Sequence, residues 1–358
     1  MKITKYIKLM SVGLLAFACT IDDAIVVEDH FFDYEIEEVP VETDYLVGAH
    51  YSKFEWRDAV PEEPTLGRYD ANKGDPQIYS QHVTQAQTAG IDYFMLGLRS
   101  SYDMDAFKAD SVYIDTLQLA SNAGELNFAI SYNFGNMGLS NDNRIEDAGL
   151  VSTLLKDFEM MLPWFQKSNY MKVDGKNVIY MLNSRDLHSN DNVALYKQLR
   201  DQMSALGVEL FIIGHQNEWT PTLRYDFRFV DCVDALTHST YANININWWD
   251  RYESFHKMID QAWSYHQETI GTYDIEYIPT ISPSINPKIN NPGSNNFVID
   301  KDVNWFSGNS NVARKVSGSH NLVILDSFND WNRGTQIESS TSYNEEYLQV
   351  LRQEFKVN

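Results

Sequence analysis

Short apolar segments of the kind that forms a buried strand recur eight times along the chain. They lie at residues 45–51, 91–98, 127–133, 177–183, 209–216, 232–240, 275–284 and 321–329. Between them, apolar residues at helical spacing predict helices at 75–90, 105–124, 146–166, 194–207 and 252–267, with a terminal helix at 343–355. The fifth and seventh crossovers have weaker helical patterns. This alternation predicts a fold built from repeated strand–helix units.

Near-continuous apolar strands joined by crossover helices predict a parallel sheet covered on both faces, and eight such units predict a closed barrel. An open doubly wound sheet that binds a nucleotide is disfavoured, because no Gly-rich phosphate loop follows the first strand. We find no short internal repeat and no linker between residues 45 and 358. The sequence therefore predicts one α/β domain over 45–358, a single (β/α)8 TIM barrel.

The N-terminus has the pattern of an export signal. Three lysines precede the apolar stretch 9–18, which is too short to span a bilayer, and small residues lead up to Cys19 as in a bacterial lipoprotein box. We predict a signal peptide at 1–18, a lipid anchor on Cys19 and an acidic tether at 19–44, with a plain signal peptide as the alternative. The acidic residues soon after Cys19 resemble the tethers of surface lipoproteins in the Bacteroides group. We therefore expect an exported lipoprotein of the outer membrane, on the cell surface.

The formal net charge of −22 argues against a nucleic-acid partner, since basic residues cluster only in the first eight positions. The other cysteine, Cys232, lies in an apolar segment and is expected to be an inert core thiol. We expect a monomer that uses no cofactor.

Polar and aromatic residues gather where the predicted strands end, and in such barrels the loops at these ends build the active site. The candidates are His50, Tyr51, Arg99, Tyr132, Asn133, His215, His238 and Tyr241, with Asn329, Asp330, Trp331, Arg333 and Gln336 after the eighth strand. Aromatic rings stack on sugars, while amide, imidazole and guanidinium groups bind hydroxyls, so an oligo- or polysaccharide is the expected ligand. The three histidines could instead ligate a metal, but no paired motif such as HExxH supports this, and we predict none.

Four segments occur in the order of a known family: LGRYDANKGDPQIYSQHVTQAQTAGIDYF (66–94), NYMKVDGKNVIYMLN (169–183), VDALTHSTY (233–241) and SFNDWNRGTQIES (327–339). They resemble glycoside hydrolase family 99 and its relatives, the endo-acting α-mannosidases and mannanases and the WbsX-type polysaccharide-biosynthesis proteins. The last segment is similar to the family's SFNEWxEGTQIEP. The resemblance implies the barrel fold and a site that handles glycans. It also implies a role for Asp70, in contacting ligand or in shaping its loop, and for Glu338 in anchoring the last loop.

The resemblance implies that two glutamates in the family's NEWxE stretch are catalytic. The first assists attack by the sugar's own 2-hydroxyl, and the second is the general acid and base. Here Asp330 stands at the first position and Arg333 at the second. Because a guanidinium does not exchange protons at physiological pH, Glu218 after the fifth strand is predicted as the substitute proton donor. Arg333 is expected to bind an anionic sugar group or to pair with Asp330 and hold it ionised.

Two function hypotheses follow. The first is a surface-anchored glycoside hydrolase with altered catalytic residues, acting on a polysaccharide or glycan that is α-mannoside-like or anionic. The second is a non-catalytic glycan-binding lipoprotein on the same barrel, favoured by the loss of the family's acid. A glycan-modifying enzyme of the WbsX kind is a third, weaker alternative, because export separates the chain from activated sugar nucleotides. The carboxylates Asp330 and Glu218 favour the hydrolase.

Overall fold

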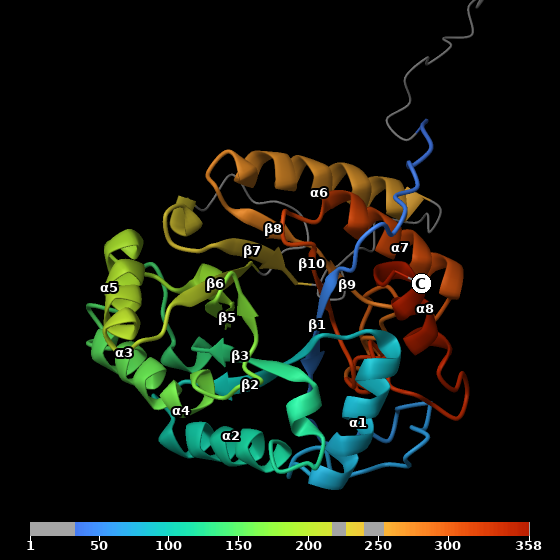
Figure 1. The fold of residues 1–358 in the computed structure, drawn as a ribbon, viewed down its shortest axis with the longest axis horizontal. Coiled ribbons are helices and arrows are strands. Elements are labelled where there is room, and N and C mark those ends of the chain that lie inside the picture. Colours follow the sequence, from blue (N-terminus) through green and yellow to red (C-terminus); the bar gives the residue numbers. More distant parts are fainter. Residues whose placement is uncertain (1–32, 217–226, 240–253, 358) are drawn as a thin grey trace, which may run out of the picture. The chain divides into compact units, whose positions relative to one another are not determined.

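The computed structural model describes residues 33–216, 227–239 and 254–357, and its strands form a nearly closed parallel barrel (Figure 1). The barrel strands are β1 (Leu46–Tyr51), β2 (Tyr93–Arg99), β3 (Asn127–Asn133), β5 (Lys176–Leu182), β6 (Leu210–Gln216), β7 (Ala235–His238), β8 (Glu276–Ile278), β9 (Thr280–Ile281) and β10 (Leu322–Leu325). Each of the eight predicted strand segments contains or overlaps one of these strands, so the predicted TIM barrel is confirmed.

The seventh barrel position is shared by two short strands. The hydrogen-bonded order runs β8-β7-β6-β5-β3-β2-β1-β10-β9, and only Pro279 separates β8 from β9 in the chain. Proline has no N–H to donate to a neighbouring strand, so the strand is interrupted there. These two strands fill the position between β7 and β10, because β8 pairs with β7 while β9 pairs with β10. The two-residue strand β4 (Lys172–Val173) forms an antiparallel hairpin with β5.

Helices surround the barrel as Figure 1 shows. They are α1 (Pro76–Ala89), α2 (Met104–Leu117), α3 (Val151–Met160), the single turn α4 (Leu162–Phe165), α5 (Asn192–Ala205), α6 (Phe255–Gly271), α7 (Val303–Val316) and α8 (Glu346–Phe355). Short 3-10 turns lie at Ala123–Glu125, Gly135–Met137, Ser184–Asp186 and Phe227–Phe229. The predicted helices are present, and α7 adds a regular helix in the seventh crossover, where the sequence indicated only a weak one.

Local sequence signals set the ends of α1. Asp75 accepts a hydrogen bond from the main-chain N of Gln77, Pro76 occupies the first turn, and Gly90 ends the helix at a φ of 71°. The helix predicted at 146–166 is shorter at its start. Gly149 has a φ of 69°, which breaks the helical path, so α3 begins at Val151.

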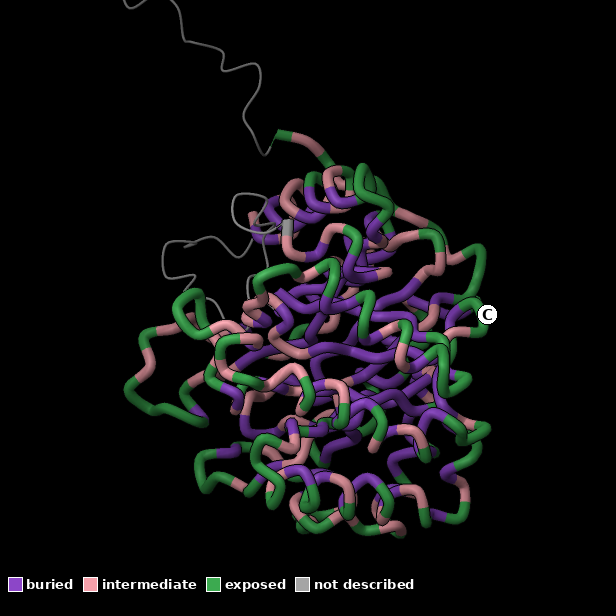
Figure 2. Tube along the Cα trace, turned by 90° about the vertical axis from the view of Figure 1, so that its left-hand side faces the viewer, coloured by how far each residue is buried: buried purple, intermediate pink, exposed green. Residues whose placement is uncertain are grey.

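The core fills the barrel and the space between the strands and the helices. Figure 2 shows buried residues along the central segments and exposed residues mainly on the outer helices and loops. On β1, Val47 and Ala49 have no exposed surface. Gly48 lies against the buried ring of Tyr93, where an added Cβ would come within 2.2 Å of the Tyr93 Cζ. The closely packed barrel leaves ligand space mainly at the strand ends.

The compact unit runs from Ile36 to Asn358. Residues 37–39 hydrogen-bond to α7, where Arg314 Nε donates to the carbonyl of Val39 at 2.9 Å. The signal peptide and Cys19 lie outside the described residues. None of the helices described is long and apolar enough to cross a membrane.

Candidate functional site

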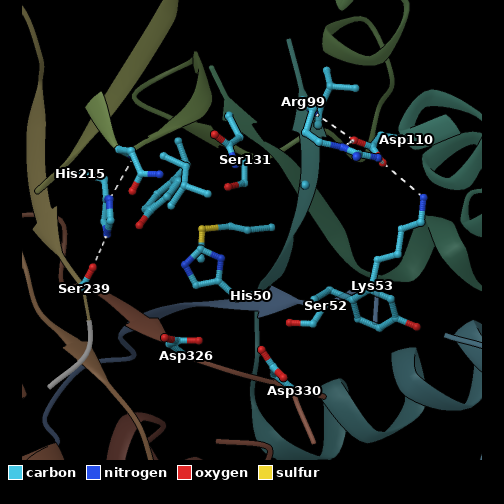
Figure 3. Close-up of a pocket in the computed structure, with 18 of the residues that line it drawn as sticks. His50, Ser52, Lys53, Arg99, Asp110, Ser131, His215, Ser239, Asp326 and Asp330 are labelled. Carbon is cyan, nitrogen blue, oxygen red and sulfur yellow. Dashed lines mark hydrogen bonds and ion pairs between the residues drawn. The ribbon is translucent and has the colours of Figure 1, made fainter. Parts of the chain in front are cut away.

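A polar cavity of about 640 Å³ opens at the carboxyl ends of the barrel strands. Figure 3 shows side chains from several strands and loops directed into it. Eight of the residues predicted for the mouth line it: His50, Tyr51, Arg99, Asn133, His215, His238, Asp330 and Arg333. A cavity of this size at the carboxyl end of a barrel has the dimensions and position of a ligand site.

Asp330 provides a carboxyl group that can titrate within the cavity. Its main-chain N donates to the Ser327 hydroxyl at 2.8 Å, and its Oδ1 accepts from the main-chain N of Arg333 at 3.2 Å. Burial raises the pKa of Asp330 to about 6, and the charge of Asp326 adds to this rise while Arg333 opposes it. A carboxyl group with this pKa exchanges protons near neutral pH, as a general acid or base must.

Asp326 was not singled out in the sequence, yet it is the main acidic partner of Arg333. Nη1 of Arg333 donates to both carboxylate oxygens of Asp326, at 3.1 and 3.0 Å. The sequence signal was present, since Asp326 is the first polar residue after β10. One of the two expectations for Arg333 was a pair with Asp330. The ion pair between side chains forms with Asp326 instead, and it offsets the charge of the guanidinium.

His215 is held neutral by its surroundings. Its Nδ1 accepts from the main-chain N of Asn183 at 3.0 Å, which leaves Nε2 to donate to the Ser239 hydroxyl at 3.1 Å. Burial lowers the pKa of His215 to about 3, and the charges of His50 and His238 lower it further. The neutral ring of His215 therefore orders Asn183 and Ser239 at the cavity wall and does not supply a proton at neutral pH.

The other two histidines of the cavity have similar environments. Nδ1 of His238 lies 2.8 Å from the carbonyl of Ser239, and burial lowers the pKa of His238 to about 4. His50 lies edge-on to Tyr180, with ring centroids 5.1 Å apart. Burial also lowers the pKa of His50, although Asp326 opposes the shift. No group of three His, Cys, Asp or Glu suited to a metal occurs in the part of the chain that the structure describes.

Two cations and one carboxylate meet on the β1–β2 side of the cavity. Arg99 at the end of β2 donates to both oxygens of Asp110 on α2, at 2.7 and 2.8 Å. Lys53, in the loop after β1, approaches the same carboxylate at 3.2 Å (Figure 3). Arg99 was predicted as a site residue, but Lys53 and Asp110 were missed. Asp110 lies on a helix, so a search of the strand ends does not predict it.

The loop after β10 is built around a buried carboxylate. Glu338 has no exposed surface and accepts from Trp331 Nε1 at 2.7 Å, the Tyr69 hydroxyl at 2.8 Å and His82 Nε2 at 3.0 Å. Trp331 was a candidate for stacking on a sugar. Its ring is fully buried in a cluster with Phe54, Val60, Ala71 and Ile289. It therefore supports the loop and does not line the cavity. Glu338 has the geometry expected of an anchor for this loop.

Four more predicted residues lie away from the cavity. Asn329 is buried and joins two loops through the main-chain N and O of Ser52, and Gln336 is buried beside Glu62. Tyr132 is buried and donates to Asp157 at 2.6 Å.

Asp70, the fourth, is exposed and pairs with Lys73 at 3.0 Å on the surface. Of its two predicted roles, the structure places it in the loop and not against the cavity. Glu218 and Tyr241 lie outside the described residues.

The chain is similar to known proteins in sequence and in fold. The model of the family described as glycosyltransferase WbsX matches residues 151–351. A solved structure titled glycoside hydrolase-like protein is 35% identical and aligns over 92% of this chain and 99% of its own, with a TM-score of 0.85. No curated protein matches the sequence.

The fold also matches a family 99 endo-α-mannosidase from Bacteroides thetaiotaomicron, solved in complex with Bis-Tris propane. The two chains are 14% identical, and the alignment covers 86% of this chain and 95% of the other with a TM-score of 0.62. At this identity the likeness concerns the fold.

Proposed function

From the premise that the chain belongs to the WbsX family and has a glycoside hydrolase-like fold, we propose that it hydrolyses glycosidic bonds of an oligo- or polysaccharide. The observation that carries the proposal is Asp330, a titratable carboxyl group in the cavity at the carboxyl end of the barrel. Family and fold indicate the class of substrate, while Asp330 supplies the proton chemistry that cleavage requires.

Asp330 acts as the proton donor to the leaving oxygen. Its raised pKa keeps a large share of the carboxyl group protonated near pH 6. Water adds to the sugar carbon that the leaving oxygen vacates, and the proton of that water passes to a second carboxylate, for which Asp326, in the lining of the same cavity, is a candidate. Glu218 remains a further candidate carboxylate.

The pH dependence of kcat/KM tests which role Asp330 has. A general acid must be protonated, so activity is expected to hold below about pH 6 and fall above it. If Asp330 were a base or nucleophile, activity would instead be lost as the pH falls below about 6. A loss of activity at low pH would overturn the assignment of Asp330 as the proton donor. It would support the role implied by the family resemblance, in which this carboxylate assists attack by the sugar's 2-hydroxyl.

A non-catalytic glycan-binding protein is the second candidate, favoured by the position of Arg333. At the family's acid position this chain has a guanidinium whose charge Asp326 offsets, and such a pair can bind sugar hydroxyls without exchanging protons. The chain without its predicted signal peptide should be incubated with a glycan panel that includes α-mannosides, and both binding and newly formed reducing ends should be measured. Release supports the hydrolase, and binding without release at high protein concentration supports the second candidate.

The cellular placement is part of the proposal. Export, acylation of Cys19 and exposure on the outer membrane would bring a monomeric barrel to polymeric glycans outside the cell. The same placement disfavours transfer from activated sugar nucleotides, although the family's description names a glycosyltransferase.

A further inference from the structure

The strongest unexplained feature of the cavity is an excess of positive charge around Asp110. The side chain of Asp110 is 6% exposed, and Arg99 alone already hydrogen-bonds to both of its oxygens. The main-chain N of Arg99 adds a third contact, at 3.1 Å. This carboxylate therefore needs no second cation, yet Lys53 lies 3.2 Å from the same oxygen that Nη2 of Arg99 contacts.

Placing Lys53 beside Arg99 brings two like charges together around one shared counterion. The three side chains carry one net positive charge among themselves, and Asp103 at the start of α2 acts on Arg99 without forming an ion pair with it. Arg333 pairs with Asp326, and Asp330 lies on a separate wall of the cavity, so neither of these carboxylates forms an ion pair with Lys53 or Arg99. An anion bound at the cluster would relieve the repulsion.

The geometry leaves room for such an anion. The side chain of Arg99 is 46% exposed, and that of Lys53 is 27% exposed. Arg99 uses Nε and Nη2 for Asp110, and none of the described residues accepts a hydrogen bond from its Nη1. In Figure 3 both side chains border the cavity on the side away from His215, and Asp330 lies on a separate wall.

We propose that Lys53 and Arg99, held by Asp110, form the subsite for a negatively charged substituent of an acidic glycan. The substituent is the carboxylate of a uronic acid or a sulfate ester, since both offer the planar or clustered oxygens that a guanidinium and an ammonium group bind. Asp110 orders the two cations but does not contact the ligand. This inference rests on the proposed action on glycans and names the substrate class for the same cavity.

The test compares acidic glycans with their own neutral counterparts. Uronate-containing oligosaccharides are paired with their carboxyl-reduced forms, and sulfated oligosaccharides with their desulfated forms. Equilibrium dissociation constants are measured for the whole chain without its signal peptide. We expect acidic members to bind at least about tenfold more tightly than their neutral counterparts, and added salt to weaken only the acidic ones. Which pair differs identifies the carboxylate or the sulfate.

Lys53→Gln is the informative variant, because it leaves the two hydrogen bonds between Arg99 and Asp110 in place. It is expected to weaken binding of the acidic ligand about tenfold more than binding of its neutral counterpart, with little change in the thermal midpoint. Lys197→Gln is the matched control, since Lys197 pairs with Asp201 on the exposed face of α5. Lys197→Gln should change neither the affinity for acidic glycans nor the affinity for neutral glycans.

Three results separate the inference from the proposed function. Tight binding or cleavage of neutral glycans alone would overturn the acidic subsite and leave the hydrolase standing. Equal affinity of Lys53→Gln and the wild type for an acidic glycan would also overturn the subsite. Absence of binding and cleavage across the whole panel would overturn the proposed function together with the inference that rests on it.

Discussion

Removing the carboxylate of Glu338 should destabilise the barrel and release the loop that carries Asp330. Glu338→Ala leaves three buried donors, on Trp331, Tyr69 and His82, without their acceptor. An unsatisfied buried donor costs about 1–3 kcal/mol, and water entering the vacated space recovers part of this, so we expect a loss of about 3–5 kcal/mol. For a chain of this size the loss corresponds to roughly 4–8 °C in thermal midpoint.

Glu338→Gln provides a graded comparison. The amide oxygen can still accept from Trp331 and Tyr69, and His82 can change its tautomer to accept from the amide NH2, so we expect a loss of only about 1–2 kcal/mol. Glu63→Ala removes an exposed ion pair with Arg68 nearby and should cost less than about 1 kcal/mol. Thermal unfolding by circular dichroism measures all three. A midpoint for Glu338→Ala that matches Glu63→Ala would refute the anchoring role.

Three further predictions concern packing, titration and export. Gly48→Ala forces a Cβ into the ring of Tyr93 and should lower stability by about 1–3 kcal/mol, whereas Gly97→Ala, with open space around its added Cβ, should not; equal thermal midpoints would contradict this. The pKa of His215 is about 3 when folded and 6.5 when unfolded, so the unfolded state binds the proton first and stability is lost as the pH falls below 6.5. The wild type should lose about 3 kcal/mol of unfolding free energy between pH 7 and pH 4 through His215, and His215→Asn should not show this loss. Urea unfolding at the two pH values measures it, and an equal loss in both proteins would contradict a buried neutral ring. Cys19→Ala should release the protein from the membrane fraction and change its electrophoretic mobility; persistent membrane association with unchanged mobility would disprove the anchor.

The barrel could be predicted from the sequence because the patterns that indicate its strands and helices are local and repeated. Each apolar strand is followed by a helix or a polar loop, and the spacing of apolar residues within each element does not depend on distant contacts. Helix α7 is the instructive exception. Its sequence, VNWFSGNSNVARKV, contains Gly308, two serines and three asparagines, all weak helix formers. Buried Trp305 packs against Phe255 of α6, and buried Phe306 packs against Tyr347 of α8. Gly308 admits His256 so closely that an added Cβ would lie 2.7 Å from its Nε2.

The candidate site could be predicted only in part, for a different reason. Position at a strand end brings a residue to the correct edge of the barrel, and this placed His50, His215 and Asp330 correctly along the cavity. It does not determine the direction of a side chain within an irregular loop. Trp331 follows Asp330 directly and yet turns toward Glu338, because a buried acceptor and a cluster of apolar rings lie behind the loop. Such partners are distant in sequence and are brought together only by the fold.

Turnover by Asp330→Asn is the measurement that tests the central claim most directly. On a glycan that the wild type cleaves, kcat and the dissociation constant should be determined side by side for both proteins, because the introduced asparagine keeps the shape of the side chain but cannot donate the carboxyl proton. The account predicts a fall in kcat of about 10² or more, with the dissociation constant within a few fold of the wild-type value. Equal kcat values for the two proteins would contradict it.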